Sequence, residues 1–546
     1  MAPILAVVLA AALASCSPAP GLQEVKVTAS GANVSSAGSV TEVLADSLAT
    51  HWQPEDADYS EAQQIDLADG PATISQPGAY RLSGKLADGQ IRVEVEQKGL
   101  VQLVLDGAHV TSETSSALYV ASADEVAVIL ADGSDNSLAD AASYEQAEDE
   151  PDAALFSKAD LSIAGQGRLT VTGRAGDAIA SKDGLVIAGG EVTVVAADDA
   201  IKGRDYLRLA GGTVTLEAGG DGLKATNAED PGAGYVLFEG GAALIEAAAD
   251  CVDAATHALI AAGSAELSCG DDAIHGEVSL VADGGQVAVR RSYEGLEAPV
   301  VKLAGGDFDI VASDDAVNAA ASTDQASSGE AGDWPGGGAG RGQAGGAMGV
   351  QDGVELSISG GSFMLRAGSD GIDANGAGVI SGGTVTVYAE ANGMEGPFDI
   401  AEAGPTITGG TVIAYGLAGR QGSILSPAAD STQGWIAAAL GSGAAAGQPI
   451  SLAAADGREL AQLTPDEAVV SLVYSAPELV TGDSYTVAAG GDEVTVTAGQ
   501  GSSGAAGGFG QRGGSERGRR GQGGQGGPGA GQPGPAAPTQ APGDEV

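Results

Sequence analysis

The chain has 546 residues, of which 88 are glycine and only 4% are aromatic, and its 73 acidic and 24 basic side chains give a formal net charge of −49. Such a charge repels phosphate backbones and anionic membrane surfaces, so nucleic acid is excluded as a partner unless a cation bridges the two, and cations are favoured. This composition is far from that of an ordinary globular protein.

The amino terminus has the pattern of a secretion signal. An apolar run from Ile4 to Leu13 has the length of a signal-peptide core, and Leu13-Ala14-Ser15-Cys16 resembles a bacterial lipobox. We therefore predict a signal peptide at 1–15 and a lipidated Cys16 that anchors an extracellular protein to the cell membrane. A plain cleaved signal peptide is the alternative. The segment departs from the usual signal pattern in one respect, because no Lys or Arg precedes the apolar run. Contact with the membrane is expected only through the lipid, because no other segment is apolar and long enough to span a bilayer.

Composition divides the rest of the chain into four parts. Residues 16–64 are rich in Ser, Ala and Asp without sustained periodicity, which is typical of a flexible tether. Alternating apolar runs begin near Ile65 and define the main folded part, 65–416, with a Gly-rich insertion at about 319–351. Strand-like runs predict a small β cap at 417–497, and the Gly/Pro/Gln/Arg-rich segment 498–546 is predicted to be disordered.

The main folded part contains an internal repeat. An acidic or Asn residue, followed by a small and then an apolar residue, recurs at Asp177, Asp199, Asp221, Asp250, Asp272, Glu294, Asp315, Asp370 and Asn392. Most intervals are 22 residues, and the two longer ones contain a loop near Asn227 and the Gly-rich insertion. Gly-Gly turns and β-branched residues within each unit exclude helical repeats. We therefore predict an all-β solenoid, a parallel β-helix of about ten to thirteen coils with three short strands each.

The recurring acids predict a calcium site. Stacked coils place equivalent residues about 4.7–4.9 Å apart, where carboxylates repel one another. Ca²⁺ takes oxygen ligands at about 2.3–2.6 Å and can bridge acids on neighbouring coils. The residues predicted to hold it are Asp198, Asp199, Asp221, Asp250, Asp253, Asp271, Asp272, Asp314, Asp315 and Asp370. Alternatively, these acids are turn residues that remain solvated.

A second row of polar residues lies three places after each acid. It consists of Lys202, Lys224, Asp253, His275, Glu297, Asn318, Asp373 and Glu395. With Lys182, the two lysines fall on three consecutive predicted coils and could hold the carboxylates of an acidic sugar, although charge compensation of nearby aspartates explains them equally well. The aromatic side chains predicted to stack on sugar rings are Trp334, Tyr206 and Tyr293.

Two cysteines remain after Cys16. Cys251 and Cys269 are 18 residues apart within a 22-residue repeat, which places them on adjacent coils a few positions out of register. They are too few for a metal cluster and could form a disulfide in an oxidising compartment. The sequence leaves open whether they pair.

Several motifs give the chain a family resemblance. They are Asp198-Asp199-Ala200-Ile201-Lys202-Gly203, Gly211-Gly212-Thr213-Val214-Thr215-Leu216 and Gly220-Asp221-Gly222-Leu223-Lys224-Ala225-Thr226-Asn227, with Gly78-Ala79-Tyr80-Arg81-Leu82-Ser83-Gly84 and Leu103-Val104-Leu105-Asp106-Gly107 upstream. Together they resemble the bacterial family called carbohydrate-binding domain-containing proteins, from Gly78 to about Tyr415.

The resemblance implies a right-handed, single-stranded parallel β-helix related in shape to pectate lyases. It further implies bound Ca²⁺ and the binding of cellulose or pectin-like acidic polymers at a cell surface. It supports as ligands Asp199, Asp221, Asp250, Asp272, Asp315 and Asp370, whereas Glu294 and Asn392 depart from the Asp pattern.

These observations favour calcium-dependent, non-catalytic binding of pectin-like polysaccharide or cellulose by a monomer at the bacterial cell surface. One alternative is a polysaccharide lyase of the pectate-lyase type, with Lys182, Lys202 or Lys224 as the base. Another is an adhesion or spacer protein. An enzyme should place a Lys or Arg near a calcium site in an open groove, a binding protein should have a groove without such a base, and a spacer should have no groove.

Overall fold

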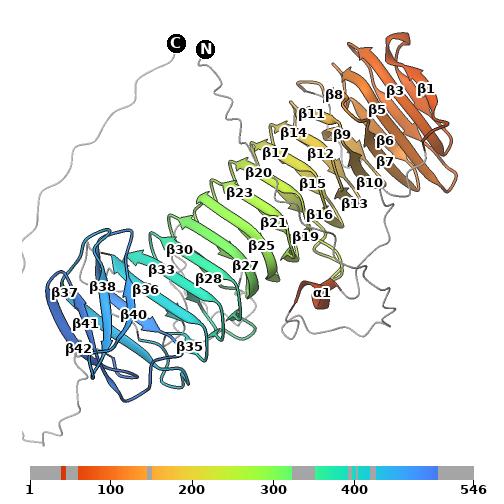
Figure 1. The fold of residues 1–546 in the computed structure, drawn as a ribbon. Coiled ribbons are helices and arrows are strands. Elements are labelled where there is room, and N and C mark those ends of the chain that lie inside the picture. Colours follow the sequence, from red (N-terminus) through yellow and green to blue (C-terminus); the bar gives the residue numbers. More distant parts are fainter. Residues whose placement is uncertain are drawn as a thin grey trace, which may run out of the picture. The chain divides into compact units, whose positions relative to one another are not determined.

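The computed structural model describes residues 39–44, 59–143, 151–321, 351–390, 396–400, 404–417 and 426–501. Nearly all regular structure in these ranges is β, with the short helices α1 (Val40–Val43) and η4 (Leu67–Asp69) beside it. Parallel strands of successive coils lie side by side from β1 to β36 (Figure 1). The prediction of a parallel β-helix is therefore confirmed.

The coils have three faces, each a row of parallel strands. The first face contains β1 (Gln63–Asp66), β3 (Gly78–Leu86), β5 (Leu100–Thr111), β7 (Glu125–Leu130), β10 (Asp160–Gly165), β13 (Gly184–Ile187), β16 (Tyr206–Leu209), β19 (Tyr235–Phe238), β22 (His257–Ile260), β25 (Ser279–Arg291), β27 (Val300–Ala312), β29 (Glu355–Ile358), β32 (Ala377–Ile380) and β35 (Thr406–Ile407). The long strands β3, β5, β25 and β27 continue around a corner onto the second face.

The second face is completed by shorter strands. These are β8 (Asp135–Ala139), β11 (Arg168–Gly173), β14 (Glu191–Ala196), β17 (Thr213–Ala218), β20 (Ala242–Ala247), β23 (Ser264–Ser268), β30 (Ser362–Ala367), β33 (Thr384–Glu390) and β36 (Thr411–Leu417). Along them, inward apolar side chains alternate with exposed ones, as in β17, where Val214 and Leu216 are buried.

The third face is a separate 13-stranded sheet. It contains β2 (Ala72–Ile74), β4 (Ile91–Glu94), β6 (Leu118–Ser122), β9 (Ala153–Ser157), β12 (Asp177–Ser181), β15 (Ile201–Gly203), β18 (Leu223–Ala225), β21 (Val252–Ala254), β24 (Ile274–Gly276), β26 (Leu296–Glu297), β28 (Val317–Ala319), β31 (Asp373–Ala374) and β34 (Asp399–Ile400). These strands are short, and those from β15 to β31 each begin two or three residues after the predicted acidic position of their coil.

The core is a stack of aliphatic side chains. On the third face Ile179, Ile201, Leu223 and Val252 are paired in register on consecutive coils, and all are buried. Each such side chain contributes about 1.5–3 kcal/mol when it leaves water. A repeated aliphatic position therefore holds neighbouring coils together without a large aromatic core.

The Gly-Gly turns are required by the stacking of coils. Gly212 has a φ of 78°, and a Cβ added there would lie 2.6 Å from the carbonyl oxygen of Gly190 in the preceding coil. Neither the backbone conformation nor the space accepts a side chain. The turns thus keep consecutive coils at strand spacing.

The C-terminal strands cover the last coil. They are β37 (Trp435–Ala444), β38 (Ile450–Ala454), β39 (Glu459–Leu463), β40 (Val469–Ser475), β41 (Ser484–Ala489) and β42 (Asp492–Thr497). β40 pairs antiparallel with β36, and the rings of Tyr388 and Tyr415 lie beneath, with centroids 4.8 Å apart. This pairing blocks the open edge of the last coil from further parallel addition.

Part of the predicted tether packs against the first face. Val40 and Leu44 are buried in a cluster with outward-facing residues that include Leu237 and Leu259. The backbone N–H of Val40 donates to Asp283 Oδ2 at 2.8 Å. Residues 39–44 are thus held on the β-helix. In the part of the chain that is described, no helix has the length and apolarity needed to cross a membrane.

Candidate functional site

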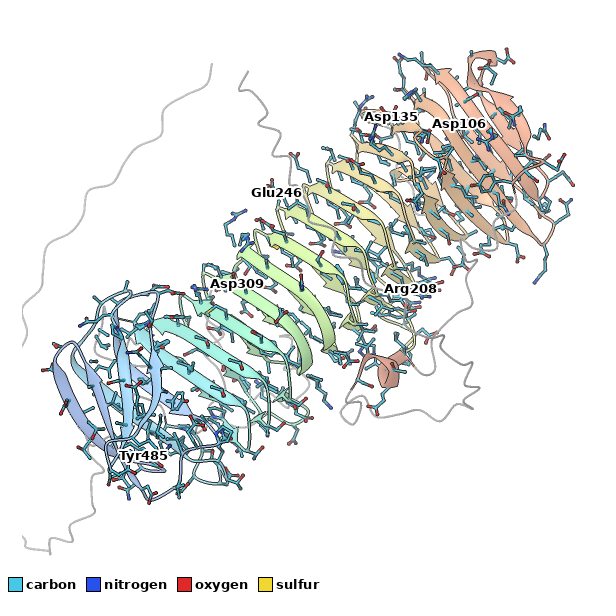
Figure 2. All side chains as sticks on the ribbon, in the orientation of Figure 1. Asp106, Asp135, Arg208, Glu246, Asp309 and Tyr485 are labelled. Carbon is cyan, nitrogen blue, oxygen red and sulfur yellow. A yellow bond between two sulfur atoms is a disulfide. The ribbon has the colours of Figure 1, made fainter. Side chains whose placement is uncertain are left out.

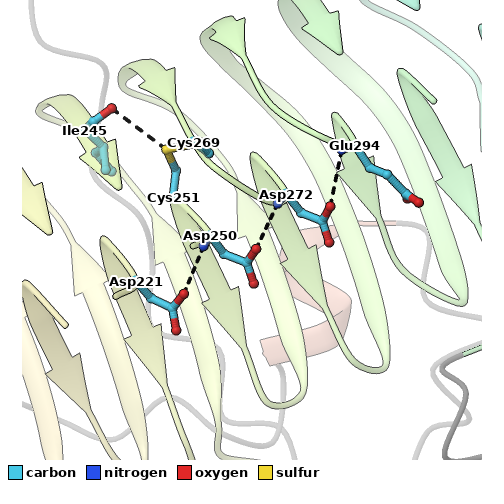
Figure 3. Close-up of a disulfide and its surroundings, with 7 residues drawn as sticks. All are labelled: Asp221, Ile245, Asp250, Cys251, Cys269, Asp272 and Glu294. Atoms are coloured by element: carbon cyan, nitrogen blue, oxygen red, sulfur yellow. Dashed lines mark hydrogen bonds between the residues drawn. A yellow bond between two sulfur atoms is a disulfide. The ribbon is translucent and has the colours of Figure 1, made fainter. Parts of the chain in front are cut away.

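The predicted acids form a hydrogen-bonded ladder at the corner between the second and third faces. Asp221 Oδ1 accepts the backbone N–H of Asp250 at 2.9 Å, and Asp250 Oδ1 accepts that of Asp272 at 2.8 Å. Asp272 Oδ1 accepts the N–H of Glu294 at 3.3 Å, as the dashed lines in Figure 3 show. Each carboxylate therefore satisfies a corner amide of the next coil, a role that neither predicted alternative included.

The same bond recurs at both ends of the ladder. Asp177 Oδ1 accepts the N–H of Asp199 at 3.2 Å, and Asp370 Oδ1 accepts that of Gly396 at 2.6 Å. Glu294 breaks the series, because its longer side chain accepts from Asn318 Nδ2 at 2.7 Å instead. Asn392, the last predicted position, lies outside the described residues.

The two lysines of the second row are bound by the ladder itself. Lys202 Nζ forms ion pairs with Asp177 and with Asp199 Oδ2, the latter at 3.4 Å. Burial opposes the charged form of Lys202, but attraction to Asp177, Asp199 and Asp152 together outweighs it and raises the lysine pKa. Lys224 Nζ likewise contacts Asp221 and lies 3.0 Å from Asp253 Oδ2. Both ammonium groups thus neutralise the protein's own acids.

Lys182 lies outside this row. The register places Ala180, and not Lys182, opposite Lys202, and Lys182 Nζ lies 3.4 Å from Asp152 Oδ2 and 5.4 Å from the Phe156 ring centroid. The three lysines therefore do not form one cluster on the described surface.

The predicted aromatic platforms have different surroundings. Tyr206 is buried, and its ring stacks on Tyr235 at 5.4 Å between centroids, so its prediction as an exposed platform is wrong. The parallel register pairs these two tyrosines, which the 29-residue interval concealed. Tyr293 is 48% exposed at the ladder corner. Trp334 lies outside the described residues.

Among the residues that the structure describes, four groups of side chains bring potential metal ligands within 4.8 Å of one another, and two of these groups already contain cations. In the group of Asp177, Asp198 and Asp199, Lys202 contacts two of the acids. In the group of Asp250, Asp253 and His275, Asp253 receives both Lys224 and His275, the latter at 3.3 Å. An added metal ion would have to displace these partners.

The other two groups contain only carboxylates and share Asp272. One consists of Asp250, Asp271 and Asp272, and the other of Asp272, Glu294 and Glu297. We call these five residues the acidic corner. Among the described residues, no Lys or Arg forms an ion pair with them, and the nearest basic group is His275, whose Nε2 lies 4.0 Å from Glu297 Oε2.

The acidic corner disfavours the ionised form of its carboxyl groups. Burial, followed by repulsion from Asp272, raises the pKa of Asp250 from 3.8 to about 7. Burial and then repulsion from Glu297 raise the pKa of Glu294 to about 9. Several carboxylates in contact, partly buried and short of positive charge, fit an oxygen-liganded divalent cation.

Other predicted ligands do not join such a group. Among the described residues, Asp221, Asp314, Asp315 and Asp370 belong to no set of three potential ligands within that distance. Asp370 is nevertheless strained electrostatically, since burial and repulsion from Asp315 raise its pKa to about 8. Asp373 has a pKa of about 7 for similar reasons.

Sequence reasoning missed two members of the acidic corner as ligands, Glu294 and Glu297. Both fell on the repeated rows, and the signal was the stacking of two acidic rows three positions apart on one coil. The departure of Glu294 from the Asp pattern counted against it. Its longer side chain is what leaves the ladder and reaches Asn318.

A disulfide lies beside the acidic corner. Cys251 and Cys269 are joined, with Cα atoms 5.5 Å apart, and both are buried (Figure 3). Cys251 directly follows Asp250, and Cys269 lies on the next coil, just before Asp271 and Asp272. The bond therefore ties together the two coils that supply three of the five acids.

The fold and this corner define a parallel β-helix protein with a cluster of acidic side chains whose arrangement could hold a metal ion. The chain matches the family model for carbohydrate-binding domain-containing proteins over residues 68–331 and 270–396, and it belongs to that family.

A relative described as a carbohydrate-binding domain-containing protein from Acetivibrio thermocellus is 37% identical over 147 residues, which are 26% of this chain and 51% of the relative. The chain thus matches about half the length of that protein. The solved structure of a polysaccharide lyase-like protein from C. thermocellum, a gadolinium derivative, is similar at 36% identity with a TM-score of 0.38, over 38% of this chain and 86% of that one.

Proposed function

We propose that this protein binds polysaccharide in a calcium-dependent way at the bacterial cell surface, without catalysis. The observation that carries the proposal is the acidic corner, where carboxylates from consecutive coils converge without a lysine or arginine partner among the described residues. Membership of the carbohydrate-binding domain family supports the ligand class. Pectin-like polygalacturonate suits such a site, because the ion can bridge its carboxylates to those of the protein, and cellulose is the other polymer that we propose as a ligand.

Calcium would be held by Asp250, Asp271, Asp272, Glu294 and Glu297. The ladder bonds engage Oδ1 of Asp250 and Asp272, and a carboxylate has a second oxygen to offer an ion. Bound Ca²⁺ would supply positive charge that offsets the mutual repulsion and could accept a sugar oxygen as a further ligand. The residues of this chain would position the ion, and the aliphatic stack beneath would keep them in place.

The lyase alternative is weakened for Lys202 and Lys224, two of its three predicted bases. A base that abstracts a proton near neutral pH must be able to lose its own proton. Lys202 and Lys224 are bound by aspartates that outweigh the effect of burial and raise the pKa of each ammonium group. Neither is therefore suited to act as a general base.

The proposed location is the outer side of the cell membrane, with lipidated Cys16 as the anchor. The buried disulfide supports an oxidising compartment. Replacing Cys16 by Ser should abolish incorporation of labelled fatty acid and release the protein from the membrane fraction. Continued membrane retention of the variant would refute the lipid anchor.

The binding proposal is tested by a pull-down of the mature chain on insoluble cellulose and on polygalacturonate, with Ca²⁺ and with a chelator. Unsaturated products are followed by absorbance in the soluble fraction. Calcium-dependent retention without product is the expected result. Product release would establish a lyase, and no retention on either polymer would favour adhesion or a spacer role.

A further inference from the structure

The second face carries a groove that lies apart from the acidic corner. It has a volume of about 630 Å³ and crosses β17, β20, β23, β25, β27 and β30. Its first row of outward side chains is Thr213, Ala242, Ser264, Gln286, Asp307 and Ser362, and its second is Thr215, Leu244, Glu266, Ala288, Asp309 and Met364. Asp309 is labelled on this face in Figure 2.

The groove is straight because the coils are in register. Six strands at about 4.7–4.9 Å spacing give it a length of roughly 24 Å along the helix axis. Small side chains at Ala242, Ser264 and Ala288 leave the hollow, while Leu244 and Met364 rise beside them. Such a groove fits an extended chain lying along the axis, so that each coil meets a successive part of it.

The charges of the groove select against an acidic polymer. Its carboxylates belong to Glu266, Asp307 and Asp309. Arg290 beside it is engaged by Glu266 at 3.3 Å and Asp309 at 3.6 Å, and Arg366 is engaged by Asp309 at 3.1 Å. A polyanion would meet like charges there, with both of these arginines already paired.

The same groups suit a neutral sugar chain. Carboxylates, hydroxyls and the Gln286 amide can bond sugar hydroxyls. Leu244 is 45% exposed and offers an apolar surface on which the C–H face of a sugar ring can pack. The lining therefore combines an apolar strip with hydrogen-bonding groups, the usual composition of a ligand groove.

We propose that this groove binds a neutral, hydroxyl-rich polysaccharide chain lying along the β-helix axis. The inference rests on the proposed function, that the protein binds polysaccharide, and it assigns neutral polymers to the groove and acidic ones to the acidic corner. Two separate surfaces would then serve the two polymer classes.

The test compares the full chain with variants in retention on microcrystalline cellulose and on polygalacturonate with Ca²⁺. Leu244→Asp puts a charge on the apolar strip, and Ala288→Trp fills the hollow. Val195→Asp is the matched control, because Val195 is 40% exposed on the same face outside the groove. Thermal unfolding of each variant establishes that it is folded.

We expect Leu244→Asp and Ala288→Trp each to raise the Kd for cellulose by about tenfold or more, equivalent to about 1.4 kcal/mol. Val195→Asp should bind cellulose like the parent chain, and all three should keep polygalacturonate retention. If folded Leu244→Asp and Ala288→Trp bind cellulose as tightly as the parent chain does, the groove is not the cellulose site, and the proposed function is unaffected. If the parent chain binds no polysaccharide, the proposed function fails and the groove inference fails with it.

Discussion

Asp250 Oδ1 accepts the backbone N–H of Asp272, one coil further on, at 2.8 Å. This bond gives the recurring aspartate a structural role, since a partly buried amide at the corner would otherwise lose this acceptor. The bond also holds the Asp250 carboxylate close to that of Asp272, because adjacent coils are only about 4.7–4.9 Å apart. The ladder thus creates the crowding of acids that a cation can relieve.

The ladder bond is expected to stabilise the fold independently of charge. Asp250→Ala should lower the free energy of unfolding by about 1–3 kcal/mol, because the amide of Asp272 loses its acceptor. Asp250→Asn keeps an acceptor oxygen and should cost much less. Urea unfolding in chelator measures both, with Glu246→Ala, an exposed acid of β20, as control. Equal losses for Ala and Asn would refute the structural role.

Without calcium, stability should fall as the pH rises. The folded pKa values of Asp250, Glu294 and Asp370 are about 7, 9 and 8, well above the ordinary values of 3.8 and 4.5. Between the ordinary and the folded pKa values, the folded protein therefore binds more protons than the unfolded chain. The stability that these protons contribute is lost as the pH rises through the folded pKa values.

Thermal unfolding in chelator should accordingly give a lower Tm at pH 9 than at pH 5. Added Ca²⁺ should raise the Tm more at pH 9 than at pH 5. At pH 9 the carboxylates are ionised, so protons no longer compete with Ca²⁺ for them. A Tm in chelator that increases from pH 5 to pH 9 would contradict the charge state described for the acidic corner.

Lys224, one of the two lysines of the second row, should be needed for stability. Lys224→Met leaves Asp221 and Asp253 without their shared cation, and we expect a loss of about 1–3 kcal/mol, less than for a fully buried pair because Lys224 is 27% exposed. Lys182→Met is the control, since its ammonium group is more exposed and forms an ion pair with one carboxylate, that of Asp152 at 3.4 Å. If urea unfolding gives similar losses of unfolding free energy for Lys224→Met and Lys182→Met, the pairing of Lys224 with the ladder contributes no more than an ordinary surface ion pair.

The disulfide should stabilise the coils at the acidic corner. Cys251 and Cys269 close a short loop, for which about 3 kcal/mol is typical. The double variant Cys251→Ala/Cys269→Ala should unfold at lower urea concentration than the parent chain, and a reductant should lower only the parent's midpoint. A midpoint of the oxidised parent equal to that of the variant would refute this contribution.

The fold could be predicted from the sequence because residues one repeat apart become neighbours in a β-helix. Ile179, Ile201 and Leu223 recur at 22 residues, and the structure pairs them in register on the third face. Tyr206 shows the limit of this reasoning: its partner Tyr235 comes after a loop that lengthens the interval, so its burial was hidden. Spacing identifies neighbours only where the repeat is unbroken.

The candidate site was predictable only in part. The stacking of acids followed from the repeat, but two of its chemical details did not. Asp177 accepts the backbone N–H of the next coil, and Lys202 turns back towards Asp177 on the preceding coil. Neither contact could be predicted, because the period of a repeat does not determine the direction of its side chains. The groove on the second face was also invisible, since its floor consists of ordinary small residues that only the register aligns.

The most direct test of the acidic corner as the calcium site is calorimetric titration of Ca²⁺ into the chelator-treated protein. Asp272→Asn keeps the ladder acceptor for Glu294 but removes the charge shared by both carboxylate groups, whereas Asp198→Asn alters a group that already contains Lys202. We predict that the parent chain and Asp198→Asn bind Ca²⁺ alike and that Asp272→Asn binds it at least about tenfold more weakly. Undiminished binding by Asp272→Asn would contradict the assignment.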